Sequence, residues 1–283
     1  MLKRLSKFAV LLAASGAVFP AVLPAQAADA SWPQQVAASY KLYFNGFEVG
    51  GYRFESRFNG KSYDATSNAN VSALFGAFKW KGDIKGEGAA EAARPRPVGY
   101  KLTFKTKSKK GSVELGFNAG AVASVALLPN KPPNPESVPL QPEHYKNVFD
   151  PMSAILAITR SVNKNPCDKR IPIFDGKARF DLEMSYKGEE RIADKTPSGQ
   201  PERLVVCRVK YVPIAGHKPK DFESPWVDYN SIEIALRPIP SANIFVPYRV
   251  TVPTTLGAAV MMAETVDITT AGHAQIALKQ QAE

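Results

Sequence analysis

The feature that most constrains this chain is an alternation of apolar and polar residues that returns in one segment after another. The clearest case is residues 180–187, where Phe180, Leu182, Met184 and Tyr186 alternate with Asp181, Glu183, Ser185 and Lys187. Successive side chains of a strand point to opposite faces, so this pattern predicts a strand with one buried face and one face in water.

Turn signals separate the alternating segments. Asn45-Gly46 and Asn59-Gly60 are dipeptides typical of tight hairpin turns, and residues 86–97, which are small, charged and proline-bearing, predict a loop. About a dozen strands follow from this pattern, and those before residue 86 are predicted to form an antiparallel meander. Because an open sheet must protect its edges, we predict a mainly β fold: a curled antiparallel sheet or incomplete β-barrel with one central helix.

Residues 150–163 predict that helix. Asp150 suits the N-cap position and Pro151 the first helical position, where its missing N–H would have no partner in any case. An apolar stripe at helical spacing follows, formed by Met152, Ile155, Leu156 and Ile158. We expect the helix to plug or flank the concave side of the sheet.

Residues 129–142 contain six prolines and can form neither a helix nor a central strand. We interpret them as a long connection inside a single β-rich domain, residues 28–283, which this loop and the helix divide into two β halves. Residues 271–283 are expected to trail off without regular structure.

The N-terminus predicts a secretory signal peptide over residues 1–27. Lys3, Arg4 and Lys7 precede an apolar run, and Ala25-Gln26-Ala27 offers a small-residue cleavage site. Removing these residues takes three positive charges from the net charge of +10 and leaves +7. No later run reaches membrane-spanning length, so we expect a periplasmic protein with no transmembrane segment after cleavage.

Two cysteines, Cys167 and Cys207, are the only ones in the chain. An isolated pair in an exported protein most simply forms a disulfide, and the C-x-x-C spacing of redox-active pairs is absent. We therefore predict a structural Cys167–Cys207 bridge.

No convincing catalytic, cofactor or metal set is present. Residues 161–164 match the S-x-x-K spacing of penicillin-binding enzymes but lack the companion motifs. His144, His217 and His273 are far apart in sequence and have no zinc-ligand spacing, and the glycine pattern of a dinucleotide site is missing. We expect no catalytic residues, no bound metal and no cofactor, and hence a non-enzyme.

Two surface patterns leave alternatives open. Eight lysines cluster in the first half, at positions 79, 81, 85, 101, 105, 107, 109 and 110. They are either the wet faces of amphipathic strands or a surface for anionic envelope components. An aromatic stripe comprises Phe78, Trp80, Tyr100, Phe104, Met184 and Tyr186. It is either core or the lining of an apolar groove for an acyl chain or a peptide.

Four segments resemble a known family. Residues 43–50, 150–154, 174–177 and 246–250 are similar to the opening hairpin, helix start, strand-turn-strand element and late strand of domain-of-unknown-function family 3108 of exported bacterial proteins. Residues 188–202 form a longer insert than is usual there. The resemblance implies a periplasmic β-rich domain, comparable in shape to half-barrels that carry lipoproteins and to envelope-integrity β-spiral proteins. It offers no catalytic residues to transfer.

Together these features predict a non-enzymatic periplasmic protein that supports cell-envelope homeostasis. Its partner would be a hydrophobic or anionic envelope component, such as a lipid, a lipoprotein or an envelope polymer. The alternative is a structural or protein-interaction scaffold with no small-molecule ligand, which a filled interior would favour. Nucleic acid is not expected, since export removes that partner. The sequence does not determine the oligomeric state.

Overall fold

The computed structural model describes residues 31–73, 76–91, 94–160, 165–192, 199–221 and 227–279. The predicted signal peptide, residues 1–27, and the predicted end of the helix, residues 161–163, lie outside the described residues. Strands dominate the described chain, which has one α-helix and three short 3₁₀ turns.

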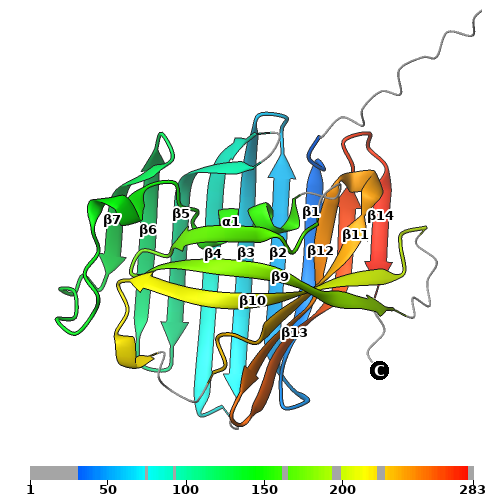
Figure 1. The fold of residues 1–283 in the computed structure, drawn as a ribbon. Coiled ribbons are helices and arrows are strands. Elements are labelled where there is room, and N and C mark those ends of the chain that lie inside the picture. Colours follow the sequence, from blue (N-terminus) through cyan, green and yellow to red (C-terminus); the bar gives the residue numbers. More distant parts are fainter. Residues whose placement is uncertain are drawn as a thin grey trace, which may run out of the picture.

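Fourteen strands form one antiparallel sheet (Figure 1). The first half contributes β1 (Gln35–Phe44), β2 (Phe47–Phe58), β3 (Ser62–Ala73), β4 (Phe78–Ala90), β5 (Pro95–Thr106), β6 (Lys110–Asn118) and β7 (Ala121–Leu128). The second half contributes β8 (Lys169–Phe174), β9 (Arg179–Arg191), β10 (Arg203–Ala215), β11 (Ile232–Ile239), β12 (Ile244–Thr254), β13 (Gly257–Thr269) and β14 (Gln275–Lys279).

The sheet is strongly curved and does not close. Its order runs β7-β6-β5-β4-β3-β2-β1-β13-β12-β11-β10-β9-β8, with β14 paired to β13 beside this path. Pairing of β1 with β13 joins the two halves, and Figure 1 shows β8, β9 and β10 crossing in front of the strands of the first half. The predicted fold class, a curled antiparallel sheet with one helix, is confirmed. Within the described residues no helix is long and apolar enough to cross a membrane.

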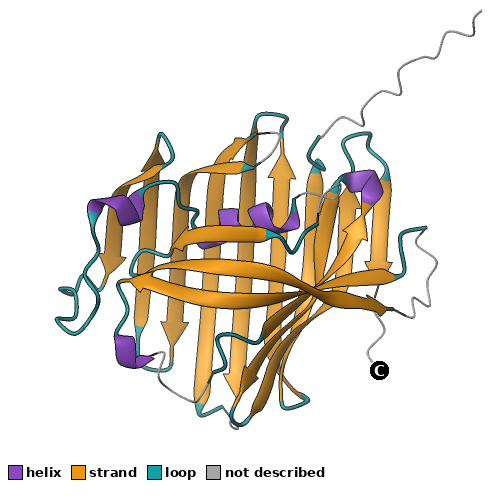
Figure 2. Ribbon diagram, in the orientation of Figure 1, coloured by secondary structure: helices purple, strands orange, loops and turns teal. Residues whose placement is uncertain are grey.

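The single α-helix, α1 (Pro151–Thr159), lies between the crossing strands and the sheet behind them (Figure 2). It packs against β8, β4, β5 and β12. The Asp150 carboxylate caps its start by accepting hydrogen bonds from the Met152 N–H at 2.8 Å and the Ser153 N–H at 3.0 Å. The predicted N-cap is therefore present, and the helix flanks the concave side.

The helix is shorter than predicted. It ends at Thr159, because Arg160 is extended (φ −79°, ψ 143°) and its backbone forms a bridge with Ile244. The Lys169 ammonium group, which donates to the carbonyls of Ala157, Ile158 and Arg160, further satisfies the helix end. Sequence periodicity cannot reveal either contact, since both partners come from other parts of the chain.

Two other sequence expectations are wrong. The loop predicted over residues 86–97 is mostly strand, because β4 continues to Ala90 and β5 begins at Pro95. Here Gly86 faces the helix, and a Cβ on it would lie 2.8 Å from the Met152 Cβ, so the glycine permits close packing. Residues 275–279, expected to trail off, instead form β14, because β13 offers them a free edge.

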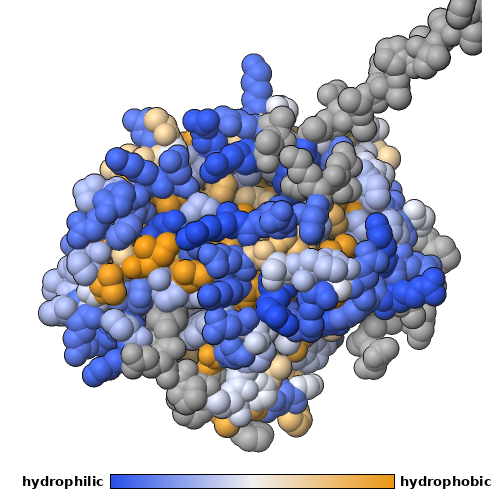
Figure 3. Space-filling model, viewed as in Figure 1, coloured by the Kyte–Doolittle hydropathy of each residue, from blue (hydrophilic) through white to orange (hydrophobic). Residues whose placement is uncertain are grey.

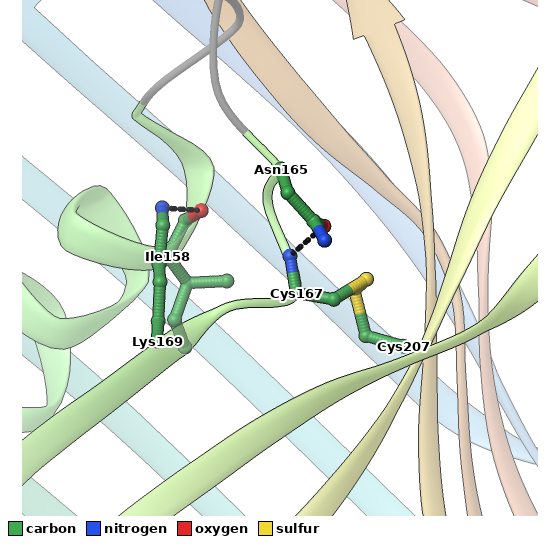
Figure 4. The surroundings of a disulfide bond; sticks show 5 residues. All are labelled: Ile158, Asn165, Cys167, Lys169 and Cys207. Carbon is green, nitrogen blue, oxygen red and sulfur yellow. Dashed lines mark hydrogen bonds between the residues drawn. A yellow bond between two sulfur atoms is a disulfide. The ribbon is translucent and has the colours of Figure 1, made fainter.

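The predicted disulfide is confirmed. Cys167 and Cys207 are bonded and fully buried, with their Cα atoms 5.2 Å apart. Cys167 lies just before β8 and Cys207 within β10, so the bond links the segment after the helix to the sheet (Figure 4). The Cys167 N–H also donates to the Asn165 side chain at 2.9 Å.

Candidate functional site

A cavity of about 140 Å³ lies between the C-terminal half of α1 and the concave face of the sheet. Its lining comes from the segment before β1 and from β1, β2, α1 and β11 to β13. The lining comprises Trp32 and Pro33, Val36, Ala38 and Tyr40 of β1, Tyr52, Phe54, Ser56 and Phe58 of β2, Ile155, Leu156, Ile158 and Thr159 of α1, and residues of β11 to β13, namely Ile234, Ile244, Phe245, Val246, Pro247, Val250 and Met261.

Strand alternation places these side chains on one face. The register sets Val36 opposite Ser56, Ala38 opposite Phe54, and Tyr40 opposite Tyr52. The residues between them, such as Arg53 and Arg57, are exposed on the other face. Ala38 is the smallest side chain in the β1 and β2 part of the lining, and the helix above does not fill the space it leaves.

The cavity carries no charge. Burial raises the pKa of the Tyr40 hydroxyl far above its usual range, and it also raises the pKa of Tyr52, so both phenols are neutral at physiological pH. Thr159 donates its hydroxyl to the Ile155 carbonyl at 3.0 Å. Such a surface favours an apolar occupant.

Ser56 is the polar exception in this lining. The residue is 1% exposed, and its hydroxyl has no hydrogen-bond partner among the described residues. A buried hydroxyl without a partner costs free energy that a ligand atom could recover. The cavity therefore offers a largely apolar space whose lining, among the described residues, includes one buried hydroxyl without a partner.

One side of the cavity is built by the segment before β1. The Trp32 ring stacks on Phe58 with centroids 4.6 Å apart, and the Arg160 guanidinium lies 4.5 Å from the Trp32 centroid. Arg160 also donates to the Ser31 and Asn243 carbonyls, each at 3.1 Å. These contacts hold the segment against the helix end, where Trp32 covers the apolar lining.

None of the six residues of the predicted aromatic stripe lines this cavity. Tyr100 and Met184 are core residues in different clusters, and Phe78 and Tyr186 are 48% and 56% exposed. Trp80 is half-buried, and a Cβ on Gly82 would lie 2.3 Å from its ring, so the indole covers that glycine. Phe104 is also half-buried. The structure does not bring the six together.

Sequence reasoning missed the residues of β1 and β2 that do line the cavity. The Asn45-Gly46 turn predicts a hairpin here, but no local signal shows that the helix ends above its two strands. A faint signal was present at Ala38, a small residue on an otherwise large, partly aromatic face.

Other motifs contribute nothing here. In the part of the chain that the structure describes, no group of three or more His, Cys, Asp or Glu is placed to hold a metal ion. The S-x-x-K motif, residues 161–164, lies outside the described residues. From the side of β8–β10, polar residues cover most of the surface, with apolar patches between them (Figure 3).

Comparisons with known proteins name no activity. A family model described as "Protein of unknown function (DUF3108)" matches residues 39–264. No curated protein matches the sequence. A solved structure, a β-barrel-like protein of domain of unknown function DUF1849 from Brucella abortus, aligns with 84% of this chain and 99% of its own, at 13% identity and a TM-score of 0.48.

Proposed function

Since this chain belongs to DUF3108, a family of unknown function, we propose its role from the cavity: it binds an apolar ligand between α1 and the sheet, and catalyses no reaction. The ligand class we propose is the acyl chain of a lipid or of a lipid-modified protein. The observation that carries the proposal is the uncharged cavity lined by β1, β2, α1 and β12.

The size of the cavity limits what it can hold. An engineered cavity of about 150 Å³ lined by Leu, Ile and Phe stays dry and binds benzene. A space of about 140 Å³ therefore suits about six carbon atoms. The occupant would be the end of a chain, with the remainder of the ligand outside.

Ser56 indicates a further property of the ligand. Its buried hydroxyl would gain a partner from a hydroxyl, ester or amide group placed near the chain end. A pure hydrocarbon would leave that hydroxyl unsatisfied. We therefore propose a chain that carries one hydrogen-bonding group.

Cell-envelope homeostasis remains the proposed biological setting. The predicted signal peptide and the disulfide favour an exported protein, because such bridges persist in oxidising compartments. In that setting, acyl chains of lipids and lipoproteins are abundant ligands.

Titration of the purified chain with a fluorescent fatty acid tests the proposal. Ala38→Leu adds a side chain that occupies the cavity, so the affinity should fall at least about tenfold while thermal stability is kept or raised. Ala126→Leu, the same change at an exposed position of β7, is the matched control and should bind normally. Equal binding by both variants would exclude this cavity as the site.

Ser56→Ala tests the hydrogen bond to the ligand separately from the packing of its apolar chain. It should weaken binding of a hydroxylated fatty acid more than binding of the unsubstituted chain. Mass spectrometry of a solvent extract of the native protein would show whether such a molecule co-purifies. A clean apo mass together with no fatty-acid binding would favour the second candidate.

That second candidate is a protein-interaction scaffold, and β7 supports it. This strand ends the sheet order, and its eight residues, AVASVALL, include no charge and no proline. Edge strands of this kind accept an added strand from a partner. Only its start is bridged, by Ala121 with Lys146. Val125→Lys should abolish such an interaction and leave ligand binding intact.

A further inference from the structure

Three hairpin turns, together with the end of β3 and the start of β4, lie side by side at one end of the sheet, the lower end in Figure 1. The turns join β12 to β13, β1 to β2, and β5 to β6. The first two are tied together, since the Asn45 N–H donates to the Ala258 carbonyl at 3.0 Å and the Asn45 side chain donates to the Leu256 carbonyl. This end, which we call the hairpin rim, is a continuous edge.

Exposed apolar side chains concentrate on the hairpin rim. Seven large hydrophobic residues are exposed in the described chain, and three of them lie at this end: Phe47 at 76%, Leu256 at 59% and Phe78 at 48%. Each occupies a turn or a strand terminus, whereas three of the other four lie within strands. Orange residues also show at the lower end of the space-filling view (Figure 3). Exposed apolar groups gathered at one edge mark an interaction site.

Lysines accompany these apolar side chains. Lys79, Lys81, Lys105, Lys107, Lys109 and Lys110 are all exposed near the same end. The register places Lys81 opposite Lys105, and Lys105 opposite Lys110, across three neighbouring strands. Like charges directly opposite each other destabilise a sheet.

No ion pair within the described chain offsets that repulsion. None of these six lysines forms an ion pair with a described residue, whereas Lys101, further along β5, pairs with Glu114 at 2.5 Å. An external anionic partner would supply the missing charge. The arrangement is consistent with a surface kept for binding rather than for stability.

We propose that the hairpin rim docks on the surface of an anionic lipid bilayer. Phe47, Phe78 and Leu256 would enter the interface between headgroups and acyl chains, while the lysines contact phosphate groups. A soluble polyanion would satisfy the lysines but would offer nothing to the apolar tips. The combination therefore favours a bilayer.

This inference is independent of the proposed ligand site. The cavity is bounded by Trp32 and by Phe58, the last residue of β2, toward the opposite end of the sheet from Phe47, the first residue of β2. Docking by the hairpin rim would leave that end facing away from the membrane. A variant that loses ligand binding in the cavity should still bind vesicles, and a variant that loses vesicle binding should still bind the ligand.

Co-sedimentation of the full chain with phospholipid vesicles tests the proposal. Vesicles containing phosphatidylglycerol should bind the protein far more tightly than vesicles of phosphatidylcholine alone. The triple variant Lys81→Gln, Lys105→Gln, Lys110→Gln should lose about 100-fold in affinity, at about fivefold per lysine. Every variant keeps the same N-terminal segment, so any vesicle binding by that segment is the same in all of them and does not affect the comparison.

Two further variants make the test specific. Lys61→Gln, Lys146→Gln, Lys177→Gln removes the same charge from exposed positions elsewhere and should bind almost normally. The double variant Phe47→Ser, Leu256→Ser should weaken binding to vesicles but not to soluble polyphosphate. If the two triple lysine variants lost equal affinity for vesicles, net charge alone would explain the binding, and the proposal would be overturned. Unchanged vesicle binding by the serine variant would overturn the bilayer assignment in favour of a soluble polyanion.

Discussion

The Tyr63 hydroxyl lies 2.6 Å from the Ser153 hydroxyl and connects β3 to the first turn of α1 across 90 residues of sequence. Ser153 in turn donates to the Asp150 carboxylate, so the tyrosine donates to the serine. All three residues are at most 1% exposed. This chain of hydrogen bonds fixes the start of the helix on the sheet, and it thereby determines where the helix end covers the cavity.

Protonation of Asp150 should make stability depend on pH. Burial raises the pKa of this carboxyl to about 6 from its ordinary 3.8, against the opposing effect of its hydrogen bonds from Ser153 and Met152. Since the folded state binds this proton more tightly than the unfolded state, the stabilisation is complete below about pH 4. It is lost as the pH rises through about 6, and amounts to about 3 kcal/mol.

Asp150→Asn isolates that contribution. The amide keeps an oxygen for the cap but cannot ionise, so the difference in unfolding free energy between wild type and variant should fall between pH 4 and pH 7. Urea unfolding at several pH values, followed by tryptophan fluorescence, measures it. A difference that stays constant with pH would refute the raised pKa.

Gly86→Ala should destabilise the protein by about 1–3 kcal/mol, because the new methyl group would lie 2.8 Å from the Met152 Cβ in a packed interior. Gly188→Ala in β9 is the matched control, since a Cβ there has no neighbour within 4 Å. The control should be neutral or slightly stabilising. Thermal unfolding compares them, and similar melting temperatures would show that the helix does not press on β4.

Removing the disulfide should destabilise the chain strongly. The bond closes a loop between residues 40 apart, which the chain-entropy model values at roughly 4 kcal/mol. The double variant Cys167→Ser, Cys207→Ser should therefore unfold at a clearly lower urea concentration than the oxidised wild type. Reduced wild type should match the variant. Alkylation of both cysteines in native protein, detected by mass, would contradict the bridge.

Lys169→Met should cost about 2–3 kcal/mol, because it removes three hydrogen bonds that close the end of α1. Burial lowers the pKa of this amine to about 8, so it still carries its proton at neutral pH. Lys177→Met, at an exposed turn, should change the stability by less than about 0.5 kcal/mol. Chemical denaturation of both variants gives the comparison.

Local patterns were sufficient for much of the fold. The alternation at residues 180–187 predicted the core of β9, Asp150 and Pro151 predicted the helix start, and two isolated cysteines predicted the disulfide. Each signal depends on neighbouring residues or on composition. Local signals gave the wrong prediction where distant contacts opposed them. At Gly86, the small neighbouring residues suggested a loop, but pairing with β3 makes the segment a strand.

Local sequence patterns of this kind could not predict the candidate site. Alternation separates an inward face from an outward face, and it placed Tyr100 in a stripe that is either core or the lining of a groove. It could not tell that Tyr100 is buried in the core whereas Tyr40 borders a cavity. That difference depends on where α1 ends, and the end is decided by Ile244 and Lys169.

By itself, then, the amino-acid sequence determined most of the strands, the curled form of the sheet, where the helix begins and which cysteines pair, because these properties follow from short-range periodicity, capping and composition. Only the tertiary structure decided the order of the strands in the sheet, the cavity beneath the helix and the shared edge of the hairpins. The physical reason is that each arises from pairing between strands far apart in sequence, above all β1 with β13, which joins residues such as Gln35 and Thr269.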